Sequence, residues 1–137
     1  MAKQGVIMAH RLLIVDDDKD IVEILSKKLS EAGYAISAAF DGEEALVKVK
    51  EDNPDIILLD LMMPKLNGFE VLKQVRQNFQ DKWRPVIIIS AKTELDSFKA
   101  CHKLEADHYL TKPCSIEKII QGIETMISLI PVRVKNK

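Results

Sequence analysis

Four short apolar runs, each followed at once by a polar or charged residue, constrain what this chain can fold into. They occupy residues 12–15, 56–59, 86–89 and 109–111. Continuous apolar runs of this length are typical of strands buried on both faces, as in a parallel sheet. Functional sites of open parallel sheets lie at the carboxyl ends of the strands, so we expect the residues after these runs to meet in one crevice.

Helical patterns separate the apolar runs. We expect strands at residues 11–15, 34–39, 55–60, 85–90 and 107–111, and helices at about residues 18–32, 42–52, 67–78, 94–104 and 115–130. Five successive strand–helix units predict an α/β sandwich, with right-handed crossovers and helices on both faces of the sheet. The predicted organisation is an N-terminal extension at residues 1–9, one domain at 10–130, and a C-terminal tail or linker stub at 131–137.

Local signals predict where individual helices begin and end. Asp18 is a suitable N-cap for the first helix, and Gly33 is a suitable left-handed stop after it. Pro131 is expected to follow the end of the last helix. The apolar stripe expected to face the sheet from the first helix consists of Ile21, Ile24, Leu25 and Leu29.

Composition argues against several classes of function. The 137 residues carry a formal net charge of −1, which gives no general attraction to nucleic acid or to acidic lipid. No stretch approaches the length of a membrane span, and residues 1–10 lack the apolar core of a signal peptide, so a cytoplasmic location is expected. Cys101 and Cys114 form no CxxC pattern and are interpreted as thiols packed as small hydrophobes.

The polar residues after the runs form a set suited to phosphoryl transfer. Asp60 is the expected nucleophile, which would become an aspartyl phosphate. Asp16 and Asp17 are expected to hold Mg²⁺ with Asp60, because this hard cation prefers carboxylate and phosphate oxygens; Mn²⁺ is a suitable substitute. Lys112 is expected to neutralise the phosphoryl group, and the Ser90 hydroxyl to bind it after transfer.

The sequence resembles the receiver domain of two-component response regulators, a CheY-like family. The resemblance covers about residues 10–130. The segments that carry it are residues 13–18, 41–46, 60–64 with Gly68, 90–91 and 109–113. An acidic pair alone is weak support, whereas these motifs in this order and at this spacing are specific.

The resemblance implies a flavodoxin-like three-layer sandwich with five helices and a five-stranded parallel sheet in the order 2-1-3-4-5. It implies that the backbone carbonyl of Met62 completes the metal site and that the Lys112–Pro113 peptide is cis. It also implies a switch in which Ser90 moves towards the phosphate and Tyr109 turns inward.

The same resemblance implies the partners. A histidine kinase or a histidine phosphotransfer protein would supply the phosphoryl group. A downstream protein would bind the face made by the fourth helix, the fifth strand and the fifth helix. No direct contact with nucleic acid or membrane is expected, and the chain is expected to be a monomer or a phosphorylation-linked dimer.

Several positions depart from the family pattern. Ser90 replaces the commoner Thr, Cys114 replaces the frequent Phe, and Glu105 stands where Gly is usual. Gly often supplies a positive φ in such a turn, so Glu105 is expected to affect the turn before the last strand. Met62 and Lys92 flank the expected approach of water, at positions that tune dephosphorylation in this family.

Other interpretations remain open from the sequence. The chain is either a stand-alone regulator or a receiver from a larger transcription factor or hybrid kinase. An Asp-nucleophile phosphatase usually needs a second acid two residues after the nucleophile, where this chain has Met62. A flavodoxin-like nucleotide- or flavin-binding domain needs a Gly-rich loop after the first strand, where this chain is acidic. A receiver without phosphorylation is disfavoured by the intact set of acids, hydroxyl and Lys.

Overall fold

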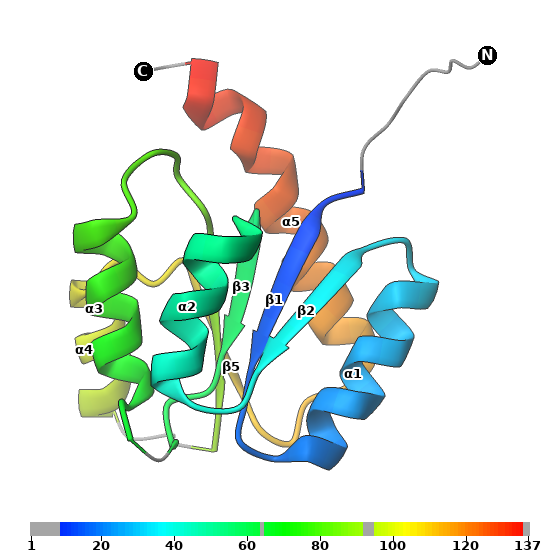
Figure 1. Cartoon of the computed structure of the whole chain (residues 1–137), viewed down its shortest axis with the longest axis horizontal. Helices are drawn as coiled ribbons and strands as arrows, with labels where there is room; N and C mark the ends of the chain where they lie inside the picture. Colours follow the sequence, from blue (N-terminus) through cyan, green and yellow to red (C-terminus); the bar gives the residue numbers. More distant parts are fainter. Residues whose placement is uncertain (1–8, 64, 92–94, 136–137) are drawn as a thin grey trace.

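The computed structural model describes residues 9–63, 65–91 and 95–135. Within them, strands and helices alternate along the chain (Figure 1). The strands are β1 (Arg11–Val15), β2 (Ala35–Ala39), β3 (Ile56–Leu59), β4 (Val86–Ser90) and β5 (His108–Thr111). The helices are α1 (Lys19–Glu31), α2 (Gly42–Asp52), α3 (Gly68–Asn78), α4 (Leu95–Lys103) and α5 (Ile116–Lys135). The strands form one parallel sheet in the order β2-β1-β3-β4-β5, which confirms the predicted fold.

Helices cover both faces of this sheet. Helices α1 and α5 lie on one face, while α2, α3 and α4 lie on the other (Figure 1). Successive residues of β1 face opposite sides: Leu13 and Val15 pack in the cluster of α2 and α3, whereas Leu12 and Ile14 pack in the cluster of α1 and α5. Each such residue contributes about 1.5–3 kcal/mol when it is fully buried. Each unbroken apolar run therefore contributes side chains to the hydrophobic cores on both faces of the sheet.

Helix α1 begins where the sequence predicts but presents a different stripe. The Asp18 side chain caps it by accepting from the backbone N–H groups of Asp20 and Ile21. Its buried residues are Val22, Leu25 and Leu29. The inward placement of Ile24 was wrong, because this side chain is 56% exposed.

The reason is the width of the apolar stripe. Val22, Leu25 and Leu29 follow the helical spacing of three and four residues and share one narrow face. Ile24 lies beside that face rather than on it. It remains at the edge of the helix and contributes to a groove described below.

Helix α5 is longer than predicted. It continues through Pro131 to Lys135, so the expectation that the helix ends before Pro131 was wrong. A proline inside a helix lacks the N–H that would bond to the carbonyl four residues earlier. Pro131 therefore removes one hydrogen bond from α5 without ending the helix. Neither α5 nor any other helix of the described residues is both long and apolar enough to cross a membrane.

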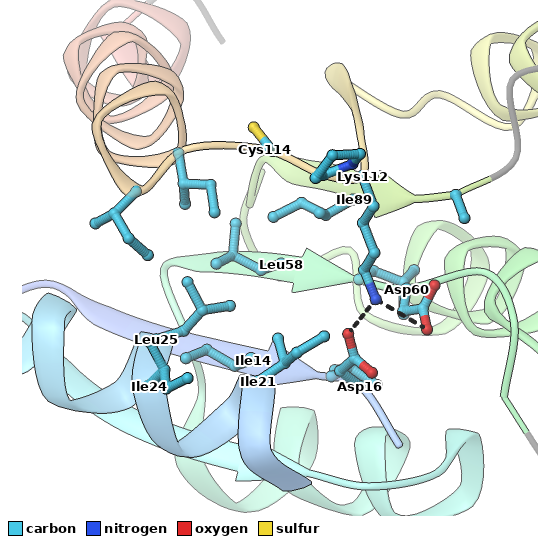
Figure 2. A pocket seen from close by; sticks show the side chains of 16 residues that line it. Ile14, Asp16, Ile21, Ile24, Leu25, Leu58, Asp60, Ile89, Lys112 and Cys114 are labelled. Atoms are coloured by element: carbon cyan, nitrogen blue, oxygen red, sulfur yellow. Dashed lines mark hydrogen bonds and ion pairs between the residues drawn. The ribbon is translucent and has the colours of Figure 1, made fainter. Parts of the chain in front are cut away.

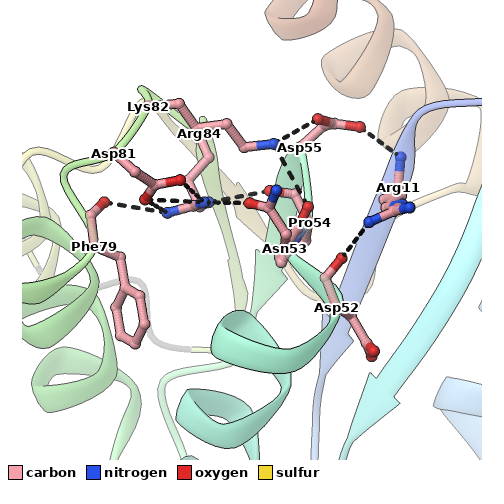
Figure 3. A network of polar contacts seen from close by, with 9 residues as sticks. All are labelled: Arg11, Asp52, Asn53, Pro54, Asp55, Phe79, Asp81, Lys82 and Arg84. Atoms are coloured by element: carbon pink, nitrogen blue, oxygen red, sulfur yellow. Dashed lines mark hydrogen bonds and ion pairs between the residues drawn. The ribbon is translucent and has the colours of Figure 1, made fainter.

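A buried arginine joins two loops at the amino-terminal ends of the strands (Figure 3). Arg84 is 1% exposed, and its guanidinium donates to the carbonyls of Pro54 and Phe79 and to the side chain of Asn53. Asn53 itself is a left-handed C-cap of α2, with φ of 48°. Arg84 thus ties the end of α2 to the loop after α3. This end of the sheet is opposite to the end that carries the acidic residues.

Charged side chains extend this network towards β1. Asp55 accepts from the Lys82 ammonium at 2.8 Å and from the backbone N–H of Arg11 at 2.8 Å. The Arg11 guanidinium donates to the Asp52 carbonyl (Figure 3). Burial tends to raise the pKa of Asp55, but the Arg11 N–H and Lys82 more than offset it and lower that pKa. These contacts fix the entry of β3 without any part in the acidic site.

Candidate phosphoryl and metal site

The carboxyl ends of four strands bring the candidate site residues to one edge of the sheet. Asp16 follows β1, Asp60 follows β3, Ser90 ends β4 and Lys112 follows β5. The backbone N–H of Asp60 donates to the Val15 carbonyl at 2.9 Å, which continues the pairing of β1 with β3. The N–H of Lys112 donates to the Ser90 carbonyl at 2.8 Å, which continues the pairing of β4 with β5. The sheet itself therefore sets the relative positions of these residues.

Three carboxylates converge at this edge. Asp16, Asp17 and Asp60 each offer an oxygen, and these oxygens all lie within 4.8 Å of one another. Asp16 and Asp60 are buried, while Asp17 is exposed to solvent. Oxygen ligands with one open side suit Mg²⁺, which keeps several waters and is commonly shared with a phosphate. The donor set therefore fits the predicted cation.

Lys112 lies against two of these acids (Figure 2). Its Nζ is 2.8 Å from Asp16 Oδ2 and 3.7 Å from Asp60 Oδ2. Burial acts to lower the pKa of Lys112, but its hydrogen bond to Asp16 and the charge of Asp60 raise that pKa above its ordinary value. The ammonium therefore stays protonated and supplies one positive charge beside the Asp60 carboxylate.

The pKa of Asp60 is raised to about 6. Burial is the largest cause and the nearby Asp16 charge adds to it, while Lys112 opposes the shift. A cation between the carboxylates would favour the ionised form and lower this pKa. Asp60 is thus a carboxyl group whose environment without a cation disfavours its charge, as expected for a functional position.

The loop after Asp60 is shaped by Gly68. A Cβ at this position would lie 2.4 Å from the Asp60 carbonyl oxygen and 2.6 Å from the Leu61 Cα. Only glycine permits this close approach of the start of α3 to the backbone of Asp60. The N–H of Gly68 donates to the Leu61 carbonyl at 3.1 Å, which closes the loop.

The other residues predicted for the site are Met62, Ser90, Tyr109 and Lys92, and the structure describes the first three. Met62 donates its backbone N–H to Asp60 Oδ1 at 3.3 Å, and its side chain is exposed. Ser90 is fully buried at the end of β4. Tyr109 is half-buried and packs against the hydrophobic core that includes Cys101 of α4. Lys92 lies outside the described residues.

Two backbone features agree with the expectations for this region. The Lys112–Pro113 peptide bond is cis. Glu105 adopts φ of 68°, a left-handed conformation in the turn before β5. The Glu105 carbonyl accepts from Arg76 Nε at 3.0 Å, and Arg76 also pairs with Asp107 at 2.6 Å. The sequence did not identify Arg76 as the residue that fixes this turn to α3.

Fold and site together define a doubly wound α/β domain with a carboxylate and lysine cluster at the carboxyl edge of its sheet. Comparison of sequences gives the family: the response regulator receiver domain matches residues 12–124. The chain belongs to this family, whose members act in two-component signal transduction.

Similar proteins agree with this assignment. The chain is 40% identical over 120 residues to the alkaline phosphatase synthesis transcriptional regulatory protein PhoP of Bacillus subtilis, covering 88% of this chain and 49% of that protein. It is 37% identical over 120 residues to the response regulator MprA of Mycobacterium bovis, covering 88% and 51%. The chain thus spans about half the length of these curated relatives.

Solved structures show the same fold. The chemotaxis protein CheY4 of Vibrio cholerae superposes with a TM-score of 0.82 at 31% identity, covering 87% of this chain and 99% of that one. The receiver domain of Francisella response regulator 1452 superposes with a TM-score of 0.79 at 38% identity, covering 85% and 95%.

Proposed function

We propose that Asp60 accepts a phosphoryl group from the phosphohistidine of a histidine kinase or a histidine phosphotransfer protein. The observation that supports this most is the position of Asp60, buried between the Asp16 carboxylate and the Lys112 ammonium at the end of β3. An Asp60 carboxylate oxygen attacks phosphorus, a P–O bond forms, and the P–N bond to the donor imidazole breaks. The imidazole leaves with its electron pair and takes up a proton.

The other residues of the site have supporting roles in this proposal. Asp16, Asp17 and Asp60 would hold Mg²⁺, with the backbone carbonyl of Met62 as a further ligand. The bound cation would supply positive charge to the phosphoryl oxygens. Lys112 leaves Asp16 and binds a phosphoryl oxygen, so that charge is neutralised where transfer develops it. The protein promotes only its own phosphorylation and dephosphorylation and turns over no separate substrate.

The response to phosphorylation is proposed to be a shift between two conformations. Ser90 binds the phosphoryl group, Tyr109 turns inward, and the surface formed by α4, β5 and α5 changes its affinity for a downstream protein. Phosphorylation could act on a monomer or stabilise a dimer through this surface. We also propose a cytoplasmic location, where such kinases present their phosphohistidine.

The length of the relatives leaves two arrangements for the whole protein. In one, this domain acts alone through protein contacts; in the other, it controls an attached output segment, as in a transcriptional regulator. Reading the coding sequence on both sides of the given residues distinguishes them. The family assignment disfavours the flavin-binding alternative, and Met62 in place of a second acid disfavours the phosphatase.

The proposed chemistry is tested by incubating the protein with phosphoramidate or acetyl phosphate and measuring intact mass. The expected result is a gain of one phosphoryl group that needs Mg²⁺ and is absent from Asp60→Asn. Asp20→Asn is the matched control, because Asp20 is an exposed acid at the start of α1 outside the carboxylate cluster. An adduct that forms equally in Asp60→Asn would contradict the proposal.

A further inference from the structure

An apolar groove opens between α1 and α5, directly beside the carboxylate cluster (Figure 2). Its volume is about 510 Å³, which is within the range of about 300–1,000 Å³ typical of small-molecule sites. The sheet contributes its floor through Ile14, Leu58 and Ile89. Ile21, Ile24 and Leu25 of α1 and Ile116 and Ile119 of α5 form its sides.

The groove combines an apolar body with one charged end. Asp16, Asp60 and Lys112 line that end, and Asp17 stands next to it. Three carboxylates against one ammonium leave two negative charges at neutral pH. Lys112 is already paired with both Asp16 and Asp60, so the groove offers no free cation to an anionic ligand.

Ile24 shows that the apolar lining extends to the surface. Its side chain is 56% exposed, one of the most exposed large apolar side chains among the described residues. Cys114 lines the same groove from the loop between β5 and α5 and is half-buried. The groove can therefore be entered from solvent, and one of its walls carries a free thiol that can report on occupancy.

We propose that this groove binds a small hydrophobic amine, with its apolar part between α1 and α5 and its ammonium at the carboxylates. Charge complementarity selects this class: a carboxylate or phosphate ligand meets net negative charge, and a neutral ligand gains only from burial. A single charge contact at about 4 Å near a protein surface therefore favours the amine over its neutral analogue by about tenfold in affinity. Phosphorylation of Asp60 would replace one of these carboxylates, so the inference applies to the unphosphorylated protein.

Occupancy of the groove is coupled to the metal site. An ammonium group and Mg²⁺ are attracted by the same carboxylates, so each lowers the affinity of the protein for the other. A hydrophobic amine bound between α1 and α5 is therefore an antagonist of metal binding.

The test uses 3-phenylpropylamine, with 3-phenylpropanol and 3-phenylpropanoate as neutral and anionic analogues. Binding is measured by calorimetry without Mg²⁺, and the alkylation rate of Cys114 by iodoacetamide is followed by peptide mass spectrometry. Cys101 is the internal control, because it is 1% exposed and burial raises its pKa to about 11. We expect the amine to bind about tenfold more tightly than the alcohol, to slow alkylation of Cys114, and to bind more weakly when Mg²⁺ is added.

Two variants locate the bound amine. Cys114→Phe places a large side chain in the groove and should abolish binding, whereas Val47→Phe adds the same side chain at a half-exposed position of α2 on the other face and should not. If Cys114→Phe does not fold, Ile24→Lys adds a positive charge at the exposed rim and should weaken amine binding severalfold. Equal binding of the three analogues, unchanged alkylation of Cys114, or full binding by Ile24→Lys would each overturn the proposal.

Discussion

Lys112 Nζ lies closer to Asp16 than to Asp60, at 2.8 Å and 3.7 Å from their Oδ2 atoms. The lysine therefore pairs mainly with a proposed metal ligand, and only secondarily with the proposed phosphoacceptor. A cation at Asp16 would compete with this pairing and free Lys112 for a phosphoryl oxygen. This relationship leads to a prediction that separates metal binding from phosphoryl transfer.

Replacing Lys112 should affect the two functions in opposite directions. Lys112→Met removes the positive charge that competes for the carboxylates, so we expect Mg²⁺ affinity to rise severalfold. The rate of phosphorylation should fall by about tenfold or more, because an electrostatic partner of the transferred group is lost. Calorimetry measures the affinity and intact mass measures the rate.

The control is Lys65→Met, since Lys65 is an exposed lysine of the loop after β3 that pairs with Asp41 at 3.5 Å. It should change neither quantity by more than about twofold, because exposed ion pairs contribute little. A Lys112→Met protein with weakened Mg²⁺ binding and an unchanged phosphorylation rate would contradict the assigned roles.

The raised pKa of Asp60 predicts a particular dependence of stability on pH. The pKa changes from its ordinary value of 3.8 to about 6, so between these values the folded protein holds a proton that the unfolded chain has lost. Without metal, the contribution of Asp60 to folding is full below about pH 4 and declines as pH rises to about 6. The free energy of unfolding should therefore decrease over this window and then level.

Asp60→Asn should remove this contribution. The variant should be more stable than the wild type by about 1–2 kcal/mol at pH 7 without Mg²⁺, after allowance for solvent screening, and similar to it below pH 4. Urea unfolding at several pH values measures both. A variant less stable than the wild type at pH 7 would show that burial does not penalise the Asp60 charge.

Gly68 offers a test of the loop that carries the site. In Gly68→Ala the new Cβ would meet backbone atoms of Asp60 and Leu61, which cannot move independently of the sheet. We expect a loss of about 1–3 kcal/mol in the free energy of unfolding, together with weaker Mg²⁺ binding. Both are read from urea unfolding and calorimetry.

Gly122→Ala is the matched control for the same chemical change. Its Cβ would lie 3.1 Å from the His108 side chain, which can adjust, and alanine favours helix α5 by up to about 1 kcal/mol. The control should be neutral or stabilising and should leave Mg²⁺ binding unchanged. Equal destabilisation by both substitutions would refute a specific role for Gly68.

Glu105 predicts a gain in stability. Its φ of 68° is unfavourable for a residue with a Cβ, so Glu105→Gly should raise the free energy of unfolding by about 0.5–1 kcal/mol. Thermal unfolding measures this change. Asn53→Gly provides the contrast: asparagine tolerates this conformation and its side chain accepts from buried Arg84, so its loss should destabilise the protein.

The sequence predicted the parts of the fold that depend on local periodicity. Apolar runs identified the strands, and the rule that sites lie at strand ends predicted that Asp16, Asp60 and Lys112 meet. The start of α1 could also be predicted from the sequence, because its N-cap Asp18 bonds to backbone N–H groups of the first helical turn.

Other features depended on contacts between distant segments. The role of Arg84 arises from carbonyls of two loops that lie about thirty and five residues away along the chain, which no local pattern encodes. The exposure of Ile24 depends on how far α5 and the sheet reach around α1. The extension of α5 beyond Pro131 shows that a single helix breaker predicts a perturbation and not an end.

The central claim is that the phosphoryl group resides on Asp60, and locating it on the chain tests this most directly. After phosphorylation with Mg²⁺ and phosphoramidate, borohydride reduction converts an aspartyl phosphate to homoserine, and peptide mass spectrometry identifies the modified residue. The account predicts homoserine at position 60 and at no other aspartate. Modification confined to Asp16, Asp17 or any residue outside the carboxylate cluster would contradict it.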